Sequence, residues 1–66
     1  MISRDQELWA CALWVEKQHG EAGPSFIGEK IKRLALEGDF EGVATWRAIA
    51  DRYDTLVDGV AGAARQ

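Results

Sequence analysis

Apolar residues along the chain repeat with the period of an α-helix in three separate segments. They recur every three or four positions over residues 4–19, 24–37 and 40–58. No stretch alternates between apolar and polar residues for long enough to indicate a β-strand. The pattern therefore predicts three helices with these bounds and an all-α fold.

Two glycine-containing stretches separate the predicted helices. Gly20 suits the position just after a helix, and Pro24 suits the first turn of the next helix, unless Ser25 caps it. Gly38 can end the second helix and Asp39 can cap the third. Because both connections are short, we expect a compact three-helix bundle in which neighbouring helices run antiparallel.

The predicted bundle occupies residues 1–58 as a single domain. Gly59 and Gly62 lower the helix propensity of the remaining segment, so residues 59–66 are expected to form a frayed tail.

The first predicted helix holds more apolar residues than one buried stripe can use. Residues 8–15 are all apolar and cover every side of a helix. The predicted core stripe, which Trp14 extends on one side, comprises Leu8, Cys11, Ala12, Val15 and His19. On another side Trp9 and Leu13 lie four residues apart and are the candidate interaction residues. We expect self-association or binding to a partner helix there, and a symmetric dimer would bring the first helices of two copies together.

The other two helices have more ordinary apolar stripes. The second-helix stripe comprises Ile27, Ile31, Leu34 and Ala35. The third has heptad-like spacing, widened by Ile49 and Leu56, over Val43, Trp46, Ala50, Tyr53, Val57 and Val60. Trp46 is placed in the bundle core, so Trp46→Ala is expected to cost roughly 3–5 kcal/mol of stability.

Size and charge narrow the functional classes. A 66-residue chain has a marginal core, and one Cys and one His exclude an internal disulfide and a Cys/His zinc site within this chain. Without a disulfide or a zinc site, so small a domain must gain its folding stability from dense helix packing or from self-association. The net charge of −3 disfavours general nucleic-acid binding. No basic segment precedes the apolar run, so we expect no signal peptide. The run is also too short to cross a membrane, and we expect a cytoplasmic protein.

Residues that could carry chemistry have simpler structural interpretations. Cys11 is expected to be a buried, inert thiol, and His19 to cap the first helix, where a cation favours the helix dipole. Two charged groups are expected to be solvated surface, namely the acidic row Asp51, Asp54 and Asp58 and the basic cluster Lys30, Lys32 and Arg33. No set of catalytic, cofactor-binding or metal-ligating side chains stands at motif spacing, so we predict a protein that is not an enzyme.

One alternative function is a small DNA-binding or transcription-regulatory protein that uses the third helix. Residues 44–53 resemble the first helix of a helix-turn-helix. The segment that follows, residues 54–60, is acidic and apolar, whereas a recognition helix carries groups for base edges and phosphates. Retention on a DNA or heparin matrix that falls with salt would favour this alternative.

The chain also resembles a group of small uncharacterised alphaproteobacterial proteins. Their pattern is a Trp, then His-Gly about ten residues later, then G-D-x-x-G-x-x-x-W-x-x-I, and here it falls on Trp9, His19-Gly20, Gly38-Asp39, Gly42, Trp46 and Ile49. The likeness covers about residues 8–56. That group has no assigned activity, so the resemblance implies a helical fold and a bacterial cytoplasmic origin, and no catalytic residues.

Overall fold

The described part of the protein is helical, as the sequence pattern predicts. The computed structural model describes residues 3–64, with side chains for residues 3–58. Its elements are α1 (Arg4–His19), the 3-10 turn η1 (Gly20–Ala22), α2 (Gly23–Leu36) and α3 (Phe40–Ala64). Residues 3–64 contain no strand, so the all-α class is confirmed.

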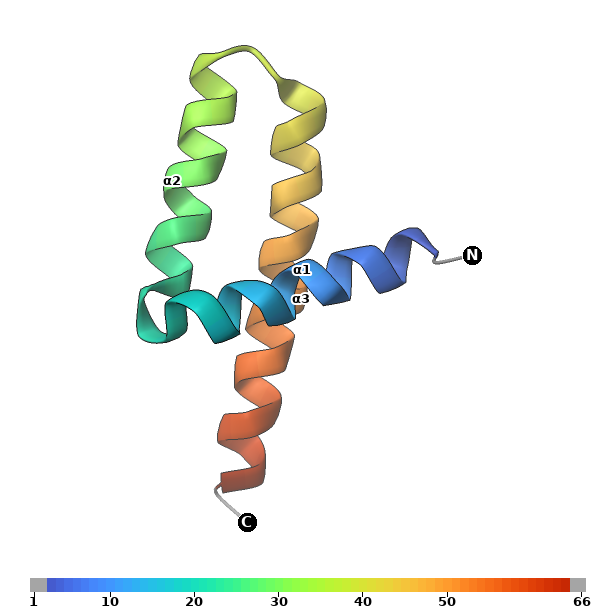
Figure 1. Ribbon diagram of the computed structural model, residues 1–66, viewed down its shortest axis with the longest axis vertical. Coiled ribbons are helices and arrows are strands. Elements are labelled where there is room, and N and C mark those ends of the chain that lie inside the picture. The colour runs from blue at the N-terminus through green and yellow to red at the C-terminus, as the bar shows by residue number, and fades with distance from the viewer. Residues whose placement is uncertain (1–2, 65–66) are drawn as a thin grey trace.

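The arrangement of the helices differs from the predicted antiparallel bundle. From Arg4 to Leu36 the backbone stays helical through η1, so α1 and α2 form one bent segment. α2 and α3 run antiparallel, but α1 lies across α3 instead of alongside it (Figure 1). The bend occurs because Gly20 adopts φ 52° and a single 3-10 turn follows, which makes a corner where the short connection predicted a reversal.

The helix ends form as the sequence predicts. Ser3 and Gln6 make a reciprocal capping box at the start of α1, and Pro24 lies in the first turn of α2, so Ser25 is not its cap. Gly38 has φ 76° and, with Asp39, donates backbone hydrogen bonds to the last turn of α2. The Asp39 carboxylate then accepts from the Gly42 N–H at 2.9 Å and caps α3.

The core lies where α1 crosses α3 and α2 closes one side. Its buried residues are Leu8, Ala12, Val15, Ile27, Ile49 and Tyr53. Ile49 is 2% exposed and lies at the centre, whereas Trp46 is half-buried and packs against the core from outside. Two helices that cross share only a small patch, so the buried stripe on each helix is shorter than in a bundle of parallel axes.

Several predicted core positions are exposed for the same reason. The first-helix prediction is wrong for Cys11, which is exposed, and for Trp14, which is 50% exposed. Ala35 on α2 and Val57 on α3 are also exposed. Ala35 lies in the last turn of α2 and Val57 lies beyond the crossing on α3. Cys11 lines an open groove beside the crossing, and Trp14 is covered on one side only, by Phe26 of α2.

α3 continues beyond the crossing to Ala64, past its predicted end at Asp58. The segment 54–64, called the α3 overhang from here on, projects past α1 with no other helix of the described residues beside it (Figure 1). This projection gives a radius of gyration of 12.7 Å, compared with about 11 Å for a compact domain of this length. The side chains of residues 59–66 lie outside the described residues, so the frayed tail stays a prediction.

Candidate interaction surface

Trp9 and Leu13, the residues selected from the sequence, lie on one exposed flank of α1. Trp9 is 38% exposed and Leu13 is 43% exposed. They are four residues apart on one helix, so their side chains adjoin. Exposure of two adjoining large apolar groups is what the excess of apolar residues in this helix predicts.

Two polar contacts show which way this flank faces. Arg4 donates to the Thr45 hydroxyl at 2.8 Å, and Arg52 donates to the Asp5 carboxylate at 2.7 Å. Because Thr45 precedes Arg52 along α3, the Asp5 side of α1 faces the carboxyl end of α3. At about 100° per residue, Trp9 lies on the Asp5 side of the buried Leu8. The flank of Trp9 therefore faces the α3 overhang.

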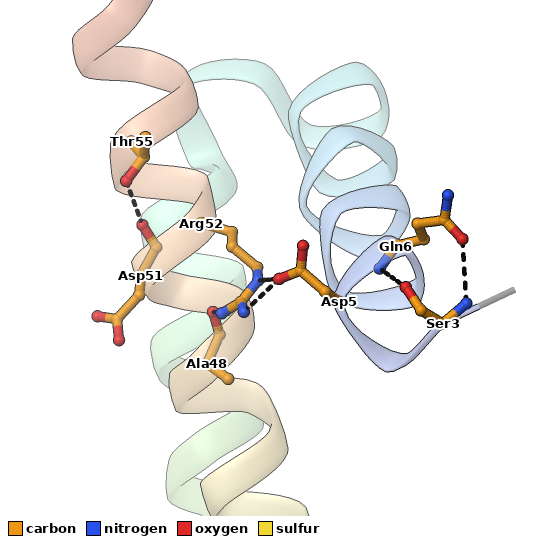
Figure 2. A network of polar contacts seen from close by, with 7 residues as sticks. All are labelled: Ser3, Asp5, Gln6, Ala48, Asp51, Arg52 and Thr55. Atoms are coloured by element: carbon orange, nitrogen blue, oxygen red, sulfur yellow. Dashed lines mark hydrogen bonds and ion pairs between the residues drawn. The ribbon is translucent and has the colours of Figure 1, made fainter.

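The Asp5–Arg52 ion pair links the amino-terminal half of α1 to α3. Figure 2 shows the Arg52 guanidinium between Asp5 and the backbone of its own helix, where it also donates to the Ala48 carbonyl at 3.1 Å. Both side chains are partly solvated, so the pair contributes at most about 1 kcal/mol. The pair therefore adds little to the packing of the buried residues where α1 crosses α3.

The α3 overhang also carries apolar side chains that are not fully buried. Val57 is 41% exposed, and the neighbouring Leu56 is half-buried. Val57 was predicted to lie in the core, because its heptad position is typical of a core residue.

The opposite flank of α1 borders an open groove against the amino-terminal half of α3. The groove has a volume of about 680 Å³, and its lining includes Leu8, Ala10, Cys11 and Ile49. Cys11 is therefore an exposed thiol beside apolar side chains, which corrects the prediction that it is buried.

His19 has a packing role at the bend between α1 and α2. Its ring stacks on Phe26 with centroids 4.0 Å apart and meets Trp14 edge-on at 5.7 Å. Phe26 in turn contacts Trp46 at 5.9 Å, so one aromatic cluster joins all three helices. As predicted, His19 lies in the last turn of α1, but the capping hydrogen bond there comes from the Gly20 N–H to the Glu16 carbonyl.

The charged rows lie on the surface, as expected. Asp51, Asp54 and Asp58 are exposed, and no group of metal-ligating side chains occurs in the part of the chain that the structure describes. The three residues of the basic cluster have different neighbours. Lys30 lies 5.8 Å from the Trp46 ring centre, and Lys32 and Arg33 share a groove with acidic neighbours. Within the described residues, no helix is both long and apolar enough to cross a membrane.

Comparison with known proteins places the chain in a family without assigning an activity. A family model described as a family of unknown function (DUF6961) matches residues 4–60, so the chain belongs to that family. Neither a curated protein nor a solved structure matches the chain. Any function must therefore be argued from the surface itself.

Proposed function

For this member of a family of unknown function, we propose a small non-enzymatic interaction protein of the bacterial cytoplasm that self-associates through the apolar flank of α1. The observation that carries the proposal is the pair Trp9 and Leu13, which are exposed side by side on α1. Large apolar side chains that adjoin on a surface mark interaction sites more often than isolated ones do.

A second copy of the same chain is the partner that the rest of the molecule favours. The core comprises only a few buried side chains at one crossing, and a domain of this size is marginally stable alone. Association stabilises the folded state because only folded copies bind each other. From their exposed fractions of 38% and 43%, Trp9 and Leu13 offer about 150 Å² per copy, given roughly 150–250 Å² for a large side chain. Burying this surface on both copies contributes roughly 7–8 kcal/mol per dimer. That gain must offset the loss of free motion on association, so we expect a weak dimer.

Analytical ultracentrifugation of matched variants tests this proposal. Wild type should sediment as a mixture of monomer and dimer at high micromolar concentration, and Leu13→Lys should sediment as monomer with an unchanged helical circular-dichroism spectrum. Leu36→Lys is the control, because Leu36 is 80% exposed at the far end of α2 and should leave the dimer intact. A monomeric wild type, or equal loss in both variants, would contradict the proposal.

A further inference from the structure

Resting on the proposed self-association, we propose that the two copies pair through the outer face of α1, with the two helices antiparallel and Glu7 of each copy against Lys17 of the other. The outer face is the side of α1 opposite its buried residues. Its exposed side chains are Gln6, Glu7, Trp9, Ala10, Leu13, Trp14 and Lys17. The proposal adds a direction, a register and a third large apolar group to the flank of Trp9 and Leu13.

Helix geometry places this face away from the core. The buried residues of α1 are Leu8, Ala12 and Val15. At about 100° per residue, Ala10 and Lys17 point almost directly away from them. Leu13 and Trp14 lie on either side of that direction. α1 crosses on the outside of α3, so no other helix of the described residues lies over this face (Figure 1). A second helix can therefore approach it along its length.

Trp14, which the sequence pattern predicts to extend the core stripe, is the third large apolar group of this face. Its side chain is 50% exposed, and its ring packs against His19 at 5.7 Å and Phe26 at 6.0 Å between ring centroids. A large side chain that is held in place before binding loses little freedom on association. Tryptophan is also enriched among the residues that dominate the energy of interfaces. Trp14 is therefore well placed to anchor a partner.

The charges at the two ends of the face determine the direction of pairing. Glu7 lies toward its amino-terminal end and Lys17 toward its carboxyl-terminal end, and neither makes an ion pair within the part of the chain that the structure describes. Parallel helices would place each residue opposite its own copy, and like charges across an interface are unfavourable. Antiparallel helices place Glu7 opposite Lys17 twice, around a twofold axis.

The same register brings the apolar side chains together. In an antiparallel pair, a step forward along one helix corresponds to a step back along the other. With Glu7 opposite Lys17, Ala10 lies opposite Trp14 of the partner. The small side chain of Ala10 leaves room for the large ring. Because antiparallel helices related by a twofold axis bring the same flanks together, Leu13 of one copy lies beside Trp9 of the other.

The area of the face fits a weak dimer. With an exposed fraction of 50%, Trp14 adds about 100 Å² to the roughly 150 Å² that Trp9 and Leu13 offer. The two copies would then bury about 500 Å² of apolar surface. Because apolar groups make up somewhat more than half of an ordinary interface, the total is about 900 Å², within the range below about 1,200 Å² that transient complexes bury.

Disulfide trapping tests the direction of pairing. In a Cys11→Ser background, Gln6→Cys and Lys17→Cys chains are mixed at high micromolar concentration, oxidised and analysed by mass spectrometry. We expect the mixed dimer to exceed either homodimer at least several-fold. Antiparallel pairing brings position 6 near position 17 of the partner and leaves like positions about 16 Å apart along the helices, whereas a disulfide needs Cα atoms within about 7 Å. Leu36→Cys mixed with Lys17→Cys gives the background level.

The outcomes separate this inference from the proposed function. An excess of the two homodimers over the mixed dimer would show parallel pairing and overturn this inference, while self-association would stand. Trapping at the background level in every mixture, with a wild type that still dimerises in the centrifuge, would do the same. A monomeric wild type, whether another protein or a lipid surface covers the face instead, would overturn both.

Charge reversal tests the register without cysteines. Lys17→Glu should weaken the dimer several-fold, because it opposes Glu7 at both ends of the interface, and adding Glu7→Lys to the same chain should restore it. Parallel pairing predicts no such rescue, since each residue would face its own copy. Lys32→Glu makes the same charge change on the exposed surface of α2 and should have a much smaller effect. A double variant no tighter than Lys17→Glu alone would overturn the proposed register.

Discussion

Gly23, at the start of α2, is the position where the structure makes its sharpest prediction about stability. Gly23 is buried with helical backbone angles, so alanine is compatible with its backbone. A methyl group there would lie 2.6 Å from Cζ of Tyr53 and closer still to its hydroxyl oxygen. Tyr53 has little room to move, since it is 5% exposed and its hydroxyl donates to the Gly20 carbonyl at 3.0 Å.

The expected change in stability can be worked out by comparing Gly23 with a second glycine on the same helix. Gly28 also lies within α2, but a methyl group there would meet nothing within 4 Å. Gly28→Ala should therefore stabilise the protein by about 0.5–1 kcal/mol through helix propensity. Gly23→Ala should instead cost about 1–3 kcal/mol through overpacking. At about 4–8 °C per kcal/mol, the two melting temperatures should differ by roughly 10 °C or more.

Thermal melts followed by circular dichroism measure this difference, and a double-mutant cycle identifies its cause. Tyr53→Phe alone should cost about 0.5–1.5 kcal/mol, because it removes the hydrogen bond to Gly20. In the Tyr53→Phe background, Gly23→Ala should cost less, since the nearest atom is gone. Strictly additive effects, or a Gly23→Ala variant as stable as Gly28→Ala, would refute the assignment of the clash to Tyr53.

Two further predictions concern the core and the exposed thiol. Ile49→Ala should lower the free energy of unfolding, measured in urea, by about 2–5 kcal/mol. Trp46→Ala should cost less than the roughly 3–5 kcal/mol expected of a fully buried Trp. A larger loss for Trp46→Ala than for Ile49→Ala would contradict the placement of Ile49 at the crossing. Cys11 should react with a maleimide in the folded protein at a rate close to that in urea, and strong protection in the folded state would show that its groove is closed.

The sequence predicted the helices and their ends, apart from the carboxyl end of α3, because those features are local. Gly38 ends α2 because it can adopt a positive φ, and Asp39 caps α3 because its carboxylate can accept a backbone N–H. Both effects involve only residues close by in the chain. The way α1 lies across α3 depends on contacts between residues far apart in the chain, such as Arg4 with Thr45. A short connection limits where the next helix starts but does not determine its direction.

The same distinction explains what was predicted of the candidate interaction surface. Trp9 and Leu13 were identified because an entirely apolar helix must expose some of its residues, whatever it packs against. Cys11 and Val57 were misplaced because helical spacing defines a face of a helix and says nothing of how far along it a partner extends. Gly59 misled the prediction of the end of α3, since one glycine lowers helix propensity without breaking the backbone hydrogen bonds.

The bend at Gly20 also favours packing of α1 against α3 of the same chain over packing against α3 of another copy. With φ 52°, Gly20 holds a conformation that residues with side chains rarely adopt, although a side chain there would meet nothing within 4 Å. A residue that favours helical angles at this position would strain the bend and favour a straight α1–α2 rod, in which α1 no longer contacts its own α3. In that rod, the apolar faces of α1 and α3 would be exposed, and each could pack against the other face on a second molecule. This exchange of α1 between copies is domain swapping. Glycine at position 20 thus keeps α1 within its own chain.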